Sequence, residues 1–185
     1  MKKIIILDRD GVINYDSSEY IKTPDEWHPI PGSLEAIAQL NRADFFVMVA
    51  TNQSGVGRGY YDIATLDQIH EKMQKELASV GGHIEEIFFC PHLPAEHCLC
   101  RKPAPGMLLR IQQKYNIDLA TVFFIGDKLT DVQAARAAGC KSLLILSAME
   151  KAVTAAHPEL IDVPRFGNLS EAVEFVIQSN EKFSP

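Results

Sequence analysis

The fold is decided by a stretch near the N-terminus, Ile4-Ile5-Ile6-Leu7-Asp8-Arg9-Asp10-Gly11. Four apolar residues in a row, three of them β-branched, predict a strand buried on both faces, as in the interior of a parallel sheet. Two carboxylates, Asp8 and Asp10, follow the strand at once, and a glycine follows them. Ligands of open α/β sheets bind beyond the carboxyl ends of the strands, so this pair lies where such a fold does its chemistry. The alternative is a strand that simply ends in a polar Asp-Gly turn.

Composition limits the class of protein. A chain of 185 residues with 46% hydrophobic and 23% charged residues fits one globular domain over residues 1–185. The net charge of −6 argues against a general nucleic-acid binder, but not against a phosphate substrate, because a metal and a few cations set the local field. The apolar run after Lys2 and Lys3 is too short for a signal peptide or a membrane span. We therefore expect a cytoplasmic monomer that binds neither nucleic acid nor membrane.

Strands and helices are predicted to alternate along the chain. The predicted strands cover residues 3–7, 45–50, 84–89, 121–125, 141–146 and, more weakly, 161–166. The predicted helices cover residues 33–43, 62–80, 107–115, 130–139 and 170–178, with Ser33, Asp62 and Thr130 as expected N-caps and glycines at 81, 82 and 139 as expected stops. This alternation predicts an α/β fold with a doubly wound, Rossmann-like parallel sheet.

Polar residues gather at three predicted strand ends: Asp8 and Asp10, Thr51 and Asn52, and Asp127 and Asp131. Their convergence at one edge of the sheet suits phosphate chemistry. Two long irregular loops, residues 14–32 and 90–105, flank this edge, and loops of such length are usually functional. They leave no room for a large cap domain.

The second loop contains a Cys-x-His and a Cys-x-Cys pair, made by Cys90, His92, Cys98 and Cys100. Three thiolates and one imidazole suit a closed tetrahedral zinc site, and a loop with little apolar content needs such a staple. His97 is a possible rival to His92, and free buried thiols are the alternative to zinc. Cys140 lies outside the set and reads as a small core residue. The remaining histidines, at 28, 70, 83 and 157, show no motif and are expected on the surface or on a helix face.

The strand-end residues resemble the motifs of the haloacid dehalogenase (HAD) superfamily of phosphatases. Asp8-Arg9-Asp10-Gly11 matches the first motif, Thr51 the second, Lys102 the third and Gly126-Asp127-Lys128 the fourth. The resemblance implies that Asp8 is a nucleophile that forms an aspartyl-phosphate and that Asp10 is the general acid and base. It implies that Thr51 and Lys102 contact the phosphoryl group. It also implies that Mg²⁺ is bound by the side chains of Asp8 and Asp127 and by the backbone carbonyl of Asp10. Asp131 either orients this shell or is simply favourable in the first turn of its helix.

A narrower resemblance is to bacterial D-glycero-D-manno-heptose 1,7-bisphosphate 7-phosphatases, which have a zinc loop of this pattern, although here the spacing from His92 to Cys98 is shorter. It implies Mg²⁺-dependent removal of the C7 phosphate in lipopolysaccharide precursor synthesis. The implied substrate residues are Arg9, Asp16, Ser17, Ser18, Glu19, Asn52, Gln53, Ser54, Arg101 and Lys128. Lys128 can alternatively anchor the acidic cluster.

Two other functions remain open at this point. The histidinol-phosphate phosphatase domain of histidine biosynthesis is a near relative and shares most of these motifs. The other is a phosphate- or metal-binding module without turnover. The presence of both Asp8 and Asp10 argues against the module, because a pure binder needs no acid–base partner.

Overall fold

A computed structural model describes residues 2–146 and 158–181. Its strands are β1 (Lys3–Leu7), β2 (Phe45–Asn52), β3 (Glu86–Cys90), β4 (Phe123–Gly126), β5 (Lys141–Ile145) and β6 (Arg165–Phe166). Its helices are α1 (Ser33–Arg42), α2 (Ser54–Gly57), α3 (Ile63–Ser79), α4 (Gly106–Tyr115), α5 (Leu129–Ala138) and α6 (Leu169–Glu181). No helix within these two ranges has the length and apolar character needed to cross a bilayer.

The strands form one parallel six-stranded sheet in the order β3-β2-β1-β4-β5-β6. The chain builds outward from β1 to β3 on one side and from β4 to β6 on the other, so the order reverses between β1 and β4. In doubly wound sheets, ligands bind at such a switch point, beyond the carboxyl ends of the strands. The predicted doubly wound, Rossmann-like parallel sheet is therefore confirmed.

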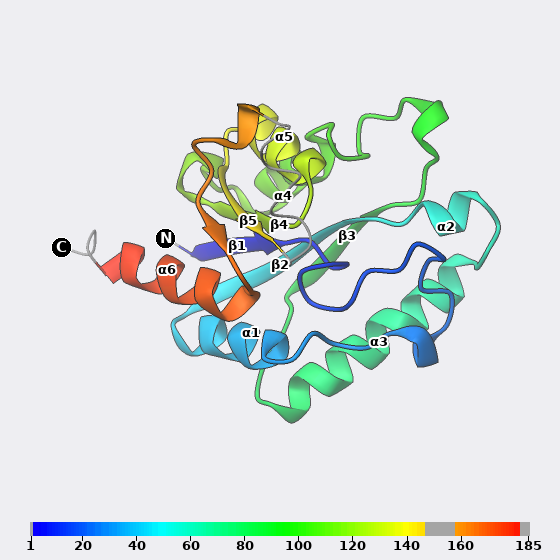
Figure 1. The fold of residues 1–185 in the computed structure, drawn as a ribbon, viewed down its shortest axis with the longest axis horizontal. Helices are drawn as coiled ribbons and strands as arrows, with labels where there is room; N and C mark the ends of the chain where they lie inside the picture. Colours follow the sequence, from blue (N-terminus) through cyan, green and yellow to red (C-terminus); the bar gives the residue numbers. More distant parts are fainter. Residues whose placement is uncertain (1, 147–157, 182–185) are drawn as a thin grey trace.

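Helices cover both faces of the sheet (Figure 1). Alternate residues of β1 point to opposite faces, as the pleat requires. Ile5 and Leu7 pack toward α1, α3 and α6, while Ile4 and Ile6 pack toward α4 and α5. Burial on both faces explains why β1 is an unbroken apolar run rather than an alternating one. Cys140 is buried in the core on the α4 and α5 side, as predicted.

Two of the three predicted helix caps are wrong. Asp62 caps α3 as predicted, since its carboxylate accepts the N–H of Thr65 at 2.8 Å. The Ser33 hydroxyl instead donates to the Ile13 carbonyl at 2.6 Å, and Gly32 is the residue before α1. Helix α5 begins before Thr130, at Leu129. At α5 the Asp131 carboxylate accepts the Lys128 N–H in place of the predicted cap, whereas no side-chain hydrogen bond caps α1.

Several element boundaries also differ. The strand predicted over 84–89 is β3, Glu86–Cys90, and the strand predicted over 161–166 is only Arg165–Phe166. Residues 119–121 form a 3₁₀ turn ahead of β4, and the polar loop expected after β2 contains the short helix α2. The loop over 14–32 contains a 3₁₀ turn at Pro24–Glu26 and otherwise remains irregular, as predicted.

Candidate active site

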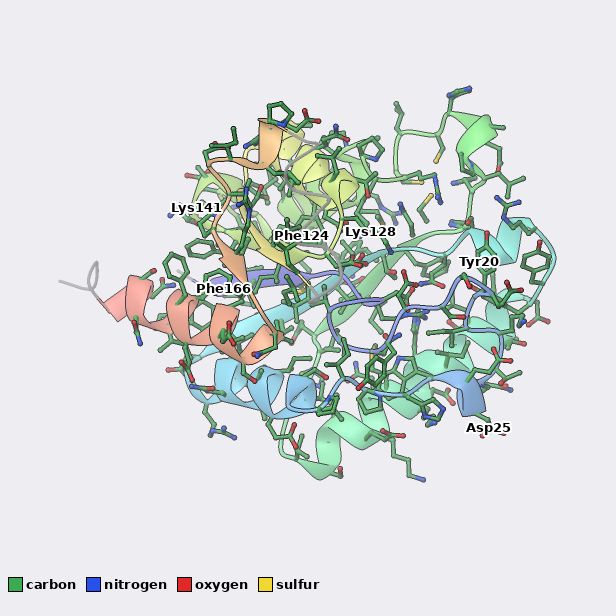
Figure 2. The ribbon with its side chains drawn as sticks, in the orientation of Figure 1. Tyr20, Asp25, Phe124, Lys128, Lys141 and Phe166 are labelled. Carbon is green, nitrogen blue, oxygen red and sulfur yellow. The ribbon has the colours of Figure 1, made fainter. Side chains whose placement is uncertain are left out.

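A cavity of about 380 Å³ lies beyond the carboxyl ends of β1, β2 and β4. It brings together side chains from the turn after β1, the 14–32 loop, the segment after β2, the end of the Cys/His loop and the start of α5. Figure 2 labels two of its lining residues, Tyr20 from the 14–32 loop and Lys128 from the segment after β4. The predicted site residues that line it are Asp8, Arg9, Asp10, Asp16, Ser17, Ser18, Thr51, Asn52, Gln53, Ser54, Arg101, Lys102 and Lys128. Glu19 does not line the cavity and is exposed, so its prediction as a substrate residue has no support in the geometry.

A tight turn follows Asp8 and requires the glycine of the first motif. The Asp8 N–H still donates to Ile125 of β4 at 2.9 Å, and the chain then leaves strand geometry. Gly11 has φ +82, a left-handed conformation that favours glycine. A Cβ on Gly11 would lie 2.2 Å from the Asp127 carboxylate. Gly11 therefore both permits the turn and lets Asp127 approach the end of β1.

Three carboxylates, those of Asp8, Asp127 and Asp131, offer oxygens that all lie within 4.8 Å of one another. Burial raises the pKa of Asp8 to about 6, although Lys102 opposes the rise. Burial and the nearby charge of Asp8 raise the pKa of Asp127 to about 8. Oδ1 of Asp127 is buried and has no hydrogen-bond partner in the described part of the chain. Crowded carboxylate oxygens with one unpartnered atom are a donor set that suits Mg²⁺, which prefers oxygen ligands.

Lys102 is the cation at the centre of this cluster. Its side chain is 3% exposed, and its Nζ lies 2.9 Å from Asp8 and 2.6 Å from Asp131. The same nitrogen donates to the Ala50 carbonyl at 2.9 Å. Burial alone would lower the pKa of Lys102, but the charges of Asp131 and Asp8 outweigh burial and raise it. Lys102 is thus held charged beside Asp8.

Asp131 fits both roles left open by the sequence. One carboxylate oxygen accepts the backbone N–H groups of Asp127 and Lys128 at 3.2 and 3.0 Å, which satisfies two donors at the start of α5. The other oxygen pairs with Lys102. The Asp131 side chain therefore fixes both the N-terminus of α5 and Lys102.

Asp10 is surrounded by donors. Its two oxygens accept from Asn14 at 2.8 Å, from Gln53 at 2.9 Å and from the Arg9 guanidinium at 3.0 and 3.1 Å. Burial would raise the pKa of Asp10, but the Arg9 charge and the hydrogen bonds from Asn14 and Gln53 outweigh it and lower the pKa. The carboxylate is therefore held ionised and in one orientation.

Two predicted substrate residues are occupied within the protein. The Asn52 side chain makes two hydrogen bonds with the backbone of Lys102, accepting its N–H at 3.0 Å and donating to its carbonyl at 3.1 Å. The Arg9 side chain is 1% exposed and paired with Asp10. The geometry therefore assigns Asn52 to holding Lys102 and the Arg9 guanidinium to holding Asp10. Both residues also line the cavity, so their role as substrate contacts stays a prediction.

The rim of the cavity is closed by an ion pair. Lys128 lies 2.8 Å from Asp16 of the 14–32 loop and 3.6 Å from Asp127. Burial alone would lower the pKa of Lys128, but the negative charges of Asp127 and Asp16 outweigh burial, and the pKa is raised. Lys128 thus neutralises the edge of the acidic cluster, the second of the two roles expected for it.

The four predicted zinc ligands come together. The Cys90, Cys98 and Cys100 sulfurs lie 3.2 to 3.5 Å apart, and Nδ1 of His92 lies 3.4 Å from Cys90 and 3.2 Å from Cys100. A tetrahedral site with Zn–S bonds of about 2.3 Å has sulfur–sulfur edges of roughly 3.8 Å, close to this spacing. The cluster contains His92 and not His97, which is exposed. The cluster can hold a metal, and Arg101 joins it to the cavity by donating to the His92 carbonyl at 3.3 Å.

Several residues of the site were not predicted from the sequence, and three of them are polar groups that shape it: Tyr20, Tyr61 and His70. Tyr20 and Tyr61 line the cavity, and the Tyr61 hydroxyl donates to Gln53 at 2.8 Å. His70 of α3 was expected on the surface or on a helix face, but it is buried, and its Nε2 lies 3.3 Å from Arg9. Burial lowers the pKa of His70 to about 3, so it is neutral and accepts from Arg9. The only signal in the sequence was the place of His70 beside Ile69 on the apolar stripe of α3. His28 and His83 are exposed, and His157 lies outside the described residues.

Comparison with known proteins agrees with this arrangement. The HAD-hydrolase-like family model matches residues 99–167. A relative from Bordetella bronchiseptica is 55% identical over 143 residues, which is 77% of this chain and 80% of that protein. A relative from Neisseria meningitidis serogroup A is 42% identical over 182 residues, which is 96% of each chain. The chain belongs to the HAD-like hydrolase family, within its phosphatases.

Both relatives are named D-glycero-beta-D-manno-heptose-1,7-bisphosphate 7-phosphatase. The crystal structure of D,D-heptose 1,7-bisphosphate phosphatase from B. bronchiseptica, complexed with magnesium and phosphate, has a TM-score of 0.90 to this chain. It is 46% identical, and the match covers 96% of this chain and 99% of that one. The family resemblance read from the motifs is confirmed.

Proposed function

We propose that this protein is a Mg²⁺-dependent phosphatase that removes the C7 phosphate of D-glycero-β-D-manno-heptose 1,7-bisphosphate, a step toward ADP-heptose and lipopolysaccharide. The observation that carries the proposal is the convergence of Asp8, Asp127, Asp131 and Lys102 at the switch point of the sheet. The names of relatives that share 42% to 55% of the sequence support the substrate and the β anomer.

The chemistry assigned to Asp8 is nucleophilic. One Asp8 oxygen attacks the phosphorus of the phosphate on C7. The bond from that phosphorus to the sugar oxygen breaks, and an aspartyl-phosphate forms. Water then attacks this phosphorus and releases inorganic phosphate and the free Asp8 carboxylate. Lys102 beside Asp8 supports this role, because a fixed cation lowers the repulsion between the carboxylate and the anionic phosphate.

Asp10 is assigned to proton transfer. It gives a proton to the leaving sugar oxygen in the first step and takes one from the attacking water in the second. The ionised form held in the free protein is the form that the second step requires. The first step requires Asp10 to take up a proton once the phosphate is bound, and the negative charge of the phosphate beside the carboxylate favours that protonated form. Thr51, which is buried at the end of β2, donates its hydroxyl to the phosphoryl group.

Mg²⁺ is assigned to the side chains of Asp8 and Asp127, with the Asp10 backbone carbonyl as a third ligand, and supplies positive charge that neutralises the phosphoryl oxygens. The unpartnered Asp127 oxygen and the magnesium in the related crystal structure support this assignment.

Zn²⁺ is assigned to Cys90, His92, Cys98 and Cys100 as a structural ion, because four protein ligands leave no open position. Its functional value is to fix Arg101 and Lys102, which follow Cys100 directly in the sequence. We also propose that Asp16, Ser17, Ser18, Ser54 and Arg101 contact the sugar or its distal phosphate, since they line the cavity.

The chain is proposed to act as a single-domain cytoplasmic monomer, and one continuous sheet through the described residues supports the single domain.

The test is a substrate panel with Mg²⁺: both anomers of heptose bisphosphate, fructose 1,6-bisphosphate, histidinol phosphate and 4-nitrophenyl phosphate. We expect the highest kcat/KM on the β-heptose bisphosphate, with phosphate released from C7. A higher kcat/KM on histidinol phosphate would replace the proposed substrate, and no hydrolysis of any member would favour a binding module.

A further inference from the structure

The side chain of Gln53 joins two groups assigned to phosphoryl transfer, Asp10 and Thr51. Gln53 follows β2, is 3% exposed, and uses both ends of its amide. Its Nε2 donates to Oδ2 of Asp10 at 2.9 Å and to the Thr51 hydroxyl at 2.9 Å. The residue is therefore placed between the proposed proton-transfer group and the proposed phosphoryl contact.

The orientation of this amide is chemically determined. Its Oε1 accepts from the Arg9 guanidinium at 3.2 Å and from the Tyr61 hydroxyl at 2.8 Å. An arginine is only a donor, so the amide oxygen must face it, and the NH₂ group must face Asp10 and Thr51. The neutral His70 accepts from the other side of the same guanidinium.

Tyr61 can reach Gln53 only because residue 55 is a glycine. A Cβ on Gly55 would lie 2.3 Å from the Tyr61 ring. One short segment therefore supplies four features of the site. Thr51 offers the hydroxyl, Asn52 holds the Lys102 backbone, Gln53 bridges Asp10 and Thr51, and Gly55 leaves room for the Tyr61 ring.

One consequence concerns the Thr51 proton. Because the Thr51 oxygen accepts a hydrogen bond from Gln53, its own O–H is directed elsewhere and is free to donate to an anion in the cavity. The same NH₂ group fixes the Asp10 oxygen in one place. Loss of the NH₂ group would release both at once.

We infer that Gln53 is a positioning residue for phosphoryl transfer, which fixes the Asp10 carboxylate and orients the Thr51 hydroxyl as a donor; the inference rests on the proposed phosphatase function. Both amide hydrogens and the amide oxygen of Gln53 are engaged within the protein, which supports a positioning role beside the predicted substrate contact of this cavity-lining residue.

The test compares Gln53→Glu and Gln53→Met with wild type on two monophosphates. Gln53→Glu keeps an oxygen for Arg9 and Tyr61, but it presents a second oxygen to Asp10 and Thr51 in place of the NH₂ group. Circular dichroism of both variants checks that the fold is retained, and Gln53→Met adds no buried charge beside Asp10. The substrates are an alkyl phosphate, whose alkoxide needs a proton to leave, and 4-nitrophenyl phosphate, whose leaving group does not. The matched control is Gln74→Met, because Gln74 makes two similar bonds to the Ile84 backbone away from the cavity.

Both Gln53 variants should lose about 10- to 100-fold in kcat/KM on the alkyl phosphate, since small errors of placement cost about that much. The loss on 4-nitrophenyl phosphate should be at least about fivefold smaller, and Gln74→Met should not change the ratio of the two substrates. Equal losses on both substrates, or no loss, would overturn the positioning role of Gln53 and leave the proposed phosphatase function standing. A wild-type protein that hydrolyses neither of these phosphates nor heptose bisphosphate would overturn the proposed function and this inference with it.

Discussion

The ammonium nitrogen of Lys102 lies 2.6 Å from Oδ1 of Asp131, and the other oxygen of that carboxylate accepts two N–H groups at the start of α5. Lys102 lies near the end of the Cys/His loop, whereas Asp131 lies in the first turn of α5, the helix that follows β4. One side chain therefore connects the loop that carries the cations with the segment between β4 and α5 that carries Asp127. This connection explains how residues far apart in sequence form one charged site.

Removing the charge of Asp131 should separate its pairing with Lys102 from its capping of α5. Asp131→Asn keeps an oxygen for the N–H groups of α5, whereas Asp131→Ala loses that cap as well. A lost cap costs about 1 kcal/mol, so thermal unfolding of the alanine variant should occur about 2–4 °C below that of the asparagine variant. Both should lower kcat/KM by at least about tenfold, because Lys102 loses one of its fixed partners. Equal activity of wild type and Asp131→Asn would contradict the positioning of Lys102 by this charge.

Replacing the proposed nucleophile should stop turnover and leave the fold intact. The Asp8→Asn amide is close in size to the carboxylate but is a poor nucleophile. Asp10→Asn should lower the rate by about 10²–10⁴-fold, the usual value of a general acid–base step. Hydrolysis rates, circular dichroism and trapping of a phosphorylated protein measure these outcomes. The control is Asp67→Asn on the exposed face of α3, and a near-normal rate in Asp8→Asn would exclude the covalent mechanism.

The two cations after Cys100 should differ in what they recognise. Lys102 contacts Asp8, so Lys102→Ala should reduce kcat/KM on a bisphosphate and on a simple monophosphate by similar factors. Arg101 lies at the cavity wall, so Arg101→Ala should weaken the bisphosphate far more than the monophosphate. Steady-state kinetics of both variants on heptose bisphosphate and 4-nitrophenyl phosphate give the comparison. The same loss on both substrates for Arg101→Ala would mean that Arg101 does not read the second phosphate.

The Cys/His cluster should contain about one zinc per chain. Cys98→Ser and His92→Ala should lose it and should lower kcat/KM, although neither residue lines the cavity, because Arg101 and Lys102 lose their fixed positions. His97→Ala is the matched control, since His97 is exposed and outside the cluster. Metal analysis of reduced protein and kinetics of the three variants decide the point. Zinc loss in His97→Ala but not in His92→Ala would mean that His97, and not His92, is the fourth ligand.

Stabilisation by Mg²⁺ should increase with pH. Burial raises the pKa of Asp8 to about 6 and that of Asp127 to about 8 in the metal-free protein, against an ordinary value near 4. Between about pH 4 and 8 the folded protein therefore holds protons that the unfolded chain has released, and these two groups lower its stability as pH rises. Mg²⁺ binds the ionised form and offsets that loss.

At about 100 times its Kd, a ligand adds ~2.7 kcal/mol, which is roughly 5–10 °C in Tm for a protein of this size. Thermal unfolding with and without Mg²⁺ should show a larger increment at pH 8 than at pH 5, and Asp127→Asn should reduce the difference. An increment that is constant with pH would contradict the raised pKa values.

Much of the fold could be predicted because it depends on near neighbours in the sequence. The unbroken run Ile4-Ile5-Ile6-Leu7 specifies a buried parallel strand, and the apolar stripe of 62–80 specifies α3 with its Asp62 cap. Asp8 and Asp127 follow strand ends and Thr51 lies at the end of β2, so their arrival at one edge of the sheet follows from the topology. Lys102 lies in the long loop that leaves β3 at the same edge. The same holds for the paired ligands around Cys90 and Cys98, which a single loop brings together.

The partner of each side chain could not be predicted in this way, because partners are set by strand order and by packing across the sheet. The sequence determined which residues stand at the edge of the sheet and what chemistry they offer. Only the tertiary structure decided that Asn52 holds the Lys102 backbone and that the Arg9 guanidinium is engaged by Asp10 and His70. It also decided between the two candidate histidines, since His92 and not His97 joins the three cysteines of the Cys/His cluster. The physical reason is that a buried polar group must find a partner within about 3 Å, and which group meets that distance depends on elements that are distant in sequence.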